Sequence, residues 1–265
     1  MEQITFYIFM FCIGTLFGSF FTLAVHRIPL HQDITHKRSY CPNCNHKLSF
    51  FDMIPVLSYI FLGGKCRYCK KKIRPRYLFL EILTGITFLL FAMSLNISFS
   101  QLNISKIIYL IFGILYFTGL IIIAGIDREH KQIRKGLLVY ELIVICIYMV
   151  YLYTVENANI YRYVIYLLIF GFIEFMQSSF LRKYKKDNYL FSILELCMLM
   201  AIFEYEYIFI YTVGIVLLTV AIKKIMEKIM KKKNKDQSLP IASFLCYSNI
   251  LVIIMINYLA CRGGN

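Results

Sequence analysis

Long apolar segments alternate with short polar connections along this chain. A helix that crosses a membrane needs roughly 20 apolar residues, and by that length eight segments predict transmembrane helices. They cover about residues 4–26, 77–96, 105–126, 136–154, 160–181, 188–203, 207–222 and 240–260. The first segment lacks both a basic start and a small-residue cleavage site, so we expect it to be retained as a span. The pattern therefore predicts an all-α polytopic membrane protein with about eight transmembrane helices.

Composition and charge support a membrane location. Hydrophobic residues make up 59% of the 265-residue chain and charged residues 17%, which is too apolar for one water-soluble core. The net charge of +14 would suggest nucleic acid binding in a soluble domain. Here Lys and Arg gather in alternate connections, at 27–76, 128–135, 182–186 and 223–235. The positive-inside rule then places these four connections in the cytoplasm and both termini outside. We expect no nucleic acid partner, and a basic surface of this kind also suits anionic lipid.

Four of the nine cysteines form a pattern with metal-site spacing. Cys41 and Cys44 make one CxxC pair, and Cys66 and Cys69 make a second pair after 21 intervening residues. Two such turns supply the four thiolates of a tetrahedral structural zinc site, and the neighbouring Lys and Arg residues favour the thiolate form. A redox pair or two disulfides is the alternative, and His46 lies close enough in sequence to replace a cysteine. The other cysteines lie in or near the spans, where packing explains them.

The residues around this loop resemble the type IV prepilin peptidases. The resemblance is dense over about the first 85 residues and then thins to two islands. The matching segments are Gly18-Ser19-Phe20 with Arg27 and Pro29, the first CxxC pair, Asp52 to Tyr59, Gly64 to Cys69, Ile73 to Tyr77 with Glu81, Ile126-Asp127 with Ile133, and Leu239-Pro240 to Phe244.

The resemblance implies an eight-span membrane aspartic protease of the cytoplasmic (inner) membrane. Such an enzyme cuts the basic leader from prepilin-like precursors at the cytoplasmic face, and then N-methylates the new amino terminus with S-adenosylmethionine. Applied to this sequence, it predicts a first transmembrane helix over 1–27, a cytoplasmic four-cysteine zinc-binding domain over 28–75, and a seven-helix peptidase domain over 76–265.

Asp127 is the first candidate catalytic residue. It follows the apolar run 120–126 at the cytoplasmic end of the third span, where an ionisable group is costly and suggests a function. The alternative is an interfacial charge paired with Arg128 or Lys131. Hydrolysis by two carboxyls needs one ionised and one protonated, so a partner at the same membrane depth is required.

The sequence leaves the second acid open. The family places an aspartate in a GxGD motif some sixty residues further on, and this chain has no such motif. We rank Asp187 first, because it lies sixty residues after Asp127 and at a matching depth, although both glycines of the motif are missing. Glu195 ranks second. A carboxyl within an apolar segment is costly in lipid and therefore suggests a function, but Glu195 lies deeper in the membrane than Asp127. Glu174, three residues after a glycine, ranks third.

Two further acids are expected to have structural and not catalytic roles. Two other functions of the whole protein also stay open. We expect Asp52 to cap a turn and Glu81 to pair with Arg74 or Arg76. A chain without a working second acid would be a catalytically inactive relative that acts as a zinc-loop membrane scaffold for pilin-like or secretion assembly. A transporter that uses Glu174 and Glu195 is the third possibility.

Overall fold

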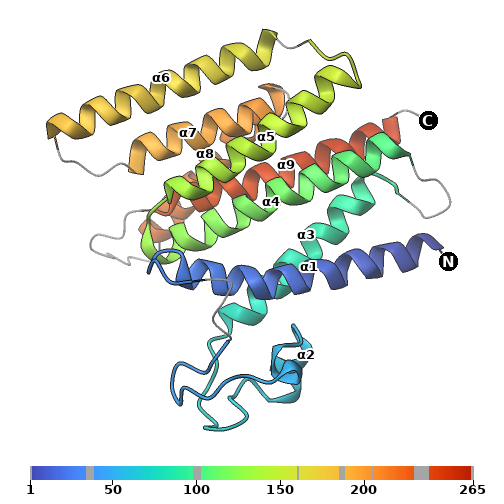
Figure 1. Cartoon of the computed structure of the whole chain (residues 1–265), viewed down its shortest axis with the longest axis vertical. Coiled ribbons are helices and arrows are strands. Elements are labelled where there is room, and N and C mark those ends of the chain that lie inside the picture. Colours follow the sequence, from blue (N-terminus) through green and yellow to red (C-terminus); the bar gives the residue numbers. More distant parts are fainter. Residues whose placement is uncertain are drawn as a thin grey trace. The chain divides into compact units, whose positions relative to one another are not determined.

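The computed structural model describes residues 2–33, 39–97, 103–159, 161–184, 189–203, 206–229 and 239–263 (Figure 1). These residues form eight long helices, which overlap the eight predicted segments: α1 Glu2–Arg27, α3 Arg76–Ser94, α4 Ile104–His130, α5 Lys135–Thr154, α6 Tyr161–Tyr184, α7 Tyr189–Phe203, α8 Glu206–Ile229 and α9 Ile241–Gly263. A short 3-10 helix, η1 Phe50–Met53, and α2 Leu57–Phe61 lie in the cysteine loop. Within the described ranges the only β structure is two isolated bridges. The prediction of an all-α membrane fold is confirmed.

Six of the long helices, α1, α3, α4, α5, α8 and α9, are long and apolar enough to cross a membrane. Helix α7 is apolar but has only 15 residues. Helix α6 is long enough, but its apolar sequence is interrupted by Arg162, Glu174 and Gln177. These two helices also carry the candidate acids Glu174 and Glu195.

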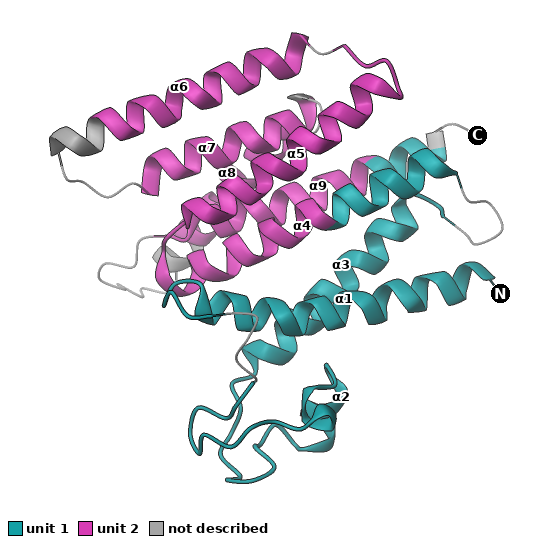
Figure 2. Cartoon of the chain, in the orientation of Figure 1, with its two compact units in different colours: residues 1–114, 257–265 teal, residues 115–256 magenta. Residues whose placement is uncertain are grey.

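The chain divides into two compact units, which Figure 2 colours separately. Residues 1–114 and 257–265 form the first unit, which contains α1, the cysteine loop and α3. Residues 115–256 form the second unit, which contains α5 to α8 and most of α4 and α9. The domain boundaries expected at residues 28 and 76 stay a prediction.

Helices α1 and α3 pack closely because glycines remove the side chains between them. A Cβ added at Gly14 would lie 2.8 Å from Cα of Gly85, and one added at Gly18 would lie 2.7 Å from Cα of Glu81. Gly14 and Gly18 are four residues apart and so share one helix face. This is the small-residue packing that lets transmembrane helices touch along their backbones.

The second unit is held by an aromatic stack and a buried polar chain. The rings of Tyr116 in α4 and Phe203 in α7 stack with centroids 3.9 Å apart. The Tyr116 hydroxyl donates to Oδ1 of Asn249 in α9 at 2.9 Å, and Nδ2 of Asn249 donates to the Thr212 hydroxyl in α8 at 3.2 Å. Because Tyr116, Asn249 and Thr212 are fully buried, these bonds connect three helices where no water competes.

Candidate functional site

The four cysteines of the loop come together as the spacing predicts. The sulfurs of Cys41, Cys44, Cys66 and Cys69 all lie within 4.8 Å of one another, and those of Cys41 and Cys69 are 3.8 Å apart. Four sulfurs placed about 2.3 Å from one zinc ion in a tetrahedron are separated by roughly 3.8 Å. The donor set and its spacing thus fit a structural zinc ion, and the pairing of the two CxxC turns is confirmed.

Both CxxC turns have the same backbone structure. In the first, the N–H of Cys41 donates to the carbonyl of His46, and the N–H of Asn45 donates to the carbonyl of Cys41. In the second, Cys66 donates to Lys71, and Lys70 donates to Cys66. The residue after each second cysteine has a left-handed backbone, with φ of 56° at Asn45 and 59° at Lys70. This turn directs both sulfurs of a pair to one point.

Asn43 connects the two turns around the sulfurs. Its side-chain N–H₂ lies 3.5 Å from the sulfur of Cys69, and its oxygen accepts a 2.6 Å bond from Nζ of Lys71. The backbone N–H of Lys71 and then the Asn43 amide lower the pKa of Cys69 to about 6. His46 does not join the cysteine cluster, and its ring packs against Tyr68 with centroids 3.6 Å apart and the two planes tilted by 33°.

Cys44 shows the electrostatic cost of crowding four sulfurs together. The N–H of His46 lowers the pKa of this thiol, but burial and the neighbouring Cys41 and Cys69 raise it to about 11. Four thiolates repel one another, so ionising one opposes the ionisation of the next. A bound dication offsets this repulsion, which is the electrostatic reason that such a cluster favours metal.

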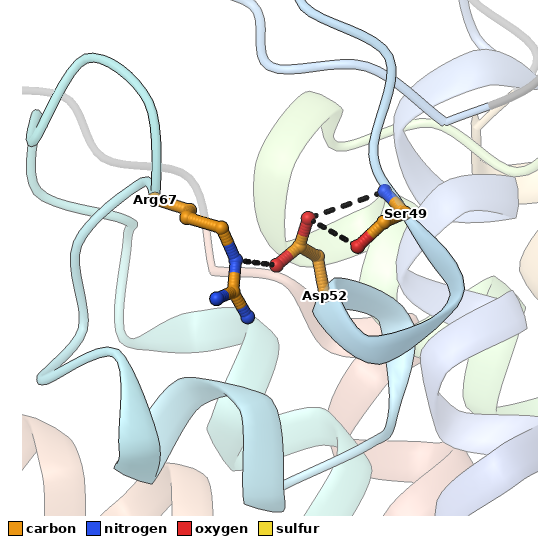
Figure 3. Close-up of polar contacts among 3 residues, drawn as sticks. All are labelled: Ser49, Asp52 and Arg67. Carbon is orange, nitrogen blue, oxygen red and sulfur yellow. Dashed lines mark hydrogen bonds and ion pairs between the residues drawn. The ribbon is translucent and has the colours of Figure 1, made fainter.

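Asp52 connects helix η1 to the second CxxC turn (Figure 3). Its Oδ1 accepts a 2.6 Å bond from Nε of Arg67, and its Oδ2 accepts bonds from the hydroxyl and N–H of Ser49 at 2.8 and 3.2 Å. Burial raises the pKa of this carboxyl, but the bonds from Arg67 and Ser49 outweigh it and leave the pKa below its usual value. Asp52 caps its turn as expected and also forms an ion pair with Arg67.

Glu81 has partners other than the arginines expected from the sequence. Its Oε2 accepts a 2.8 Å bond from the N–H of Val56, and the Ser19 hydroxyl bonds to the same carboxyl. Val56 has φ of 60°, which is costly for a β-branched residue. Glu81 therefore joins α1, α3 and the start of α2, and it holds a strained residue of the loop in place.

Asp127 is fully buried at the last turn of α4. Its Oδ1 accepts a 2.7 Å bond from the Tyr189 hydroxyl at the start of α7, and its Oδ2 accepts a 2.7 Å bond from the N–H of Ser243 in the first turn of α9. The N-terminus of a helix favours a negative charge, so α9 stabilises an ionised Asp127. The structure thus brings together the two downstream sequence islands, residues 126–133 and 239–244.

The two candidate glutamates gather elsewhere in the second unit. Glu174 in α6 and Glu195 in α7 lie within hydrogen-bonding reach of each other. Nζ of Lys135 in α5 bonds both oxygens of Glu174 at 2.8 and 3.2 Å. Glu195 is 2% exposed, whereas the side chain of Glu174 reaches the surface. Neither glutamate has Asp127 among its interacting groups.

Comparison with known proteins agrees with the resemblance seen in the sequence. Residues 12–95 match the family model of the bacterial peptidase A24 N-terminal domain. The chain is similar to the prepilin leader peptidases. Relatives named prepilin leader peptidase/N-methyltransferase include those from Klebsiella pneumoniae, 32% identical over 135 residues, Myxococcus xanthus, 42% over 83 residues, and Bacillus subtilis, 32% over 133 residues.

These matches cover part of each protein. They span 49%, 31% and 50% of this chain, and 55%, 25% and 50% of the Klebsiella, Myxococcus and Bacillus proteins respectively. The chain thus aligns with about half or less of the length of these prepilin leader peptidases. No solved structure matches it.

Asp187, the first-ranked second acid, lies outside the described residues. In the sequence it stands two residues before Tyr189, whose hydroxyl binds Asp127. Its place as the partner expected from the prepilin peptidase resemblance stays a prediction.

Glu141 is a buried acid that the sequence interpretation missed. It lies in α5 with none of its surface exposed, and its carboxyl packs against the backbone of α4 at Gly119 and Leu120. The available signal was a single acid within an apolar run, Val139 to Ile145. The facing Gly119 leaves space for the carboxyl, and no local sequence pattern indicates that pairing.

Proposed function

We propose that this chain is a membrane endopeptidase that removes the basic leader from prepilin-like precursors at the cytoplasmic face of the inner membrane. The observation that carries the proposal is the setting of Asp127. This carboxyl is buried at the end of α4 and receives hydrogen bonds from Tyr189 in α7 and Ser243 in α9. Asp127 and Ser243 belong to the two downstream islands that resemble the prepilin peptidases. The similarity to proteins named prepilin leader peptidase supports the substrate class.

In this proposal, Asp127 is the ionised member of a carboxyl pair. The N–H of Ser243 and the Tyr189 hydroxyl stabilise its negative charge, so it acts as the base that takes a proton from the attacking water. A second, protonated carboxyl donates a hydrogen bond to the scissile carbonyl and polarises it. The tetrahedral intermediate then collapses as the leaving amine takes from Asp127 the proton that came from water, which breaks the peptide bond, releases the leader with a new carboxyl group and leaves a new amino terminus on the remaining chain.

Asp187 is our first choice for the protonated carboxyl, followed by Glu195 and then Glu174. Asp187 is supported by its sequence position beside Tyr189. Glu195 is supported by its burial and by the neighbouring Glu174 carboxyl, because two adjacent carboxyls do not both ionise readily. We rank Glu195 below Asp187 because Glu195 already interacts with Glu174 and Lys135.

The four cysteines would hold Zn²⁺, which would supply a structural crosslink within the loop. All four ligand positions are then filled, so the ion has no open position for substrate. The relatives' printed names also include N-methyltransferase. We therefore include in the proposal the transfer of a methyl group from S-adenosylmethionine to the new amino terminus.

The test is to incubate the purified chain with a synthetic prepilin-like precursor, with and without S-adenosylmethionine, and to weigh the products. We expect cleavage by the wild type, a further methyl mass with the methyl donor, and no cleavage by Asp127→Asn. Glu129→Gln is the matched control, because it removes an acid from the same helix end without touching the buried carboxyl. Cleavage retained in Asp127→Asn would refute the assignment.

A second candidate is a non-catalytic membrane scaffold that binds precursors or assembly components through the zinc loop. The observation that favours it concerns the groups that interact with Asp127 in the described part of the chain, which are Tyr189, Ser243 and Lys131 and include no second carboxyl. The scaffold predicts that the wild type crosslinks to the precursor and leaves its mass unchanged. It also predicts that Asp127→Asn, Asp187→Asn and Glu195→Gln bind the precursor equally well.

A further inference from the structure

The cysteine loop carries a large apolar surface on η1 and α2. Phe50 and Phe51 are 75% and 70% exposed, and Ile60 and Phe61 are 61% and 83% exposed. Leu57 is half exposed as well. A small water-soluble domain rarely leaves so many large apolar side chains uncovered on two adjacent short helices. We refer to these five residues as the η1–α2 face.

Hydrogen bonds to Glu81 fix the depth of this face relative to the spans of its own unit. The N–H of Val56, the residue immediately before α2, bonds Glu81 at 2.8 Å. Glu81 lies five residues into α3, or roughly 7 Å from its start at 1.5 Å per residue. Ser19, which contacts the same carboxyl, lies eight residues before the end of α1, or about 12 Å inward.

If α3 spans the bilayer, that depth corresponds to the outer part of the hydrocarbon core. Helix α3 has 19 residues and is therefore about 28 Å long, close to the thickness of the hydrocarbon core of a bilayer, so both of its ends lie near the edges of that core. A contact more than one turn inside α3 places the start of α2 beside the acyl chains and not in the cytosol. The apolar side chains of the η1–α2 face then lie at the level of the headgroups and upper acyl chains.

The local backbone and charge also suit this position. The N–H groups of residues 57, 58, 60 and 62–64 all donate to nearby carbonyls, so few unsatisfied donors would enter the lipid. Residues 39–75 contain seven Lys and Arg side chains and one acid, Asp52. Apolar side chains flanked by basic residues are typical of segments that lie in an anionic membrane interface.

We propose that the η1–α2 face inserts into the lipid interface and anchors the zinc loop against the bilayer. The occupant of this face is lipid, with acyl chains against the aromatic side chains and anionic headgroups against the basic residues that follow α2. The other occupants to consider are the apolar helix of a precursor and a soluble protein. Lipid is favoured because both ends of the loop join membrane spans and the bonds to Glu81 hold α2 at their level.

The chain contains no tryptophan, which allows a direct test. Phe61→Trp introduces a single fluorophore on the η1–α2 face, and Tyr40→Trp introduces one on the first CxxC turn as the matched control. Each full-length variant is placed in nanodiscs of mixed zwitterionic and anionic lipid. Bromine near the top of the acyl chains is the lipid quencher, and acrylamide is the aqueous quencher. Zinc content and melting temperature confirm that both variants are folded.

We expect the emission of Phe61→Trp to be shifted to shorter wavelength than that of Tyr40→Trp. We also expect it to be quenched several-fold more strongly by brominated lipid and several-fold less by acrylamide. Equal acrylamide quenching of the two variants, without lipid quenching, would overturn the proposal. A response of Phe61→Trp that appears only after a prepilin-like peptide is added would also overturn it, in favour of a peptide surface.

Discussion

The backbone N–H of Ser243 donates a 2.7 Å hydrogen bond to Oδ2 of Asp127 across 116 residues of sequence. A backbone donor in the first turn of a helix holds its direction better than a flexible side chain does. Together with the Tyr189 hydroxyl, it fixes both oxygens of the carboxylate and joins the ends of α4, α7 and α9. The candidate catalytic residue is thus also a junction of three helices, and the two roles make different predictions.

Tyr189→Phe tests the hydroxyl that binds Asp127. Removing one hydrogen bond to a carboxylate costs about 1.5–3 kcal/mol, so we expect precursor cleavage to slow by roughly tenfold to a hundredfold. The measurement is the rate of leader removal by purified enzyme. Tyr140→Phe is the control, because it loses a 2.9 Å bond to the carbonyl of Leu115 in the same unit without touching Asp127. Equal rates in the two variants would argue against a role for the Tyr189 hydroxyl in the reaction.

Cys66→Ser tests the metal centre. The proposal that the four thiolates hold zinc predicts that replacing one of them abolishes metal binding. We expect the variant to lose the metal and the protease resistance of residues 39–75, because metal binding contributes folding free energy. The measurement is the zinc-to-protein ratio by elemental analysis, with limited proteolysis of the loop. Cys12→Ser is the control, since that cysteine lies in α1 outside the cluster and should leave one zinc per chain. Full zinc content in Cys66→Ser would contradict the four-cysteine assignment.

Asp52→Asn tests the ion pair with Arg67. The folded-state pKa of Asp52 is below its unfolded value of about 3.9, so its ionisation stabilises the loop above that pH and the effect is lost as pH falls through the folded-state pKa. Because Arg67 is about half exposed and its charge is screened by solvent, we expect the ion pair to make only a small contribution to the stability of the loop. The measurement is the melting temperature of the zinc loop in the wild type and the variant. Their difference should be constant across neutral pH and shrink below about pH 4, whereas a difference that grows with acid would contradict this sign.

Gly14→Ala tests the contact between α1 and α3. A methyl group there would lie 2.8 Å from the α3 backbone, so the helices must separate, at a cost of roughly 1–3 kcal/mol. Gly171→Ala in α6 is the matched control, because its added Cβ would meet nothing within 4 Å and alanine has the higher helix propensity. Thermal unfolding in detergent should show a lower melting temperature for the first variant and an equal or higher one for the second. Two equal melting temperatures would mean that α1 and α3 are not in close contact.

The sequence by itself determined the helices and the four-cysteine cluster. The apolar segments predicted each long helix, because a lipid environment selects for hydrophobic length, which is a local property. The pairs Cys41–Cys44 and Cys66–Cys69 were predictable because a CxxC turn directs both sulfurs to one side whatever surrounds it. Asp127 stood out because a charge at the end of an apolar span is costly.

Only the tertiary structure decided which of these residues meet. Glu81 was expected to pair with nearby arginines, but the crossing of α1 and α3 presents it to Ser19 and to the N–H of Val56. Glu174 and Glu195 were separate candidates until the packing of α6 against α7 brought them together with Lys135. Glu141 was overlooked because its space is created by Gly119 on another helix. Contacts of this kind depend on which faces of distant helices pack together, and that is settled by the whole bundle and not by local sequence.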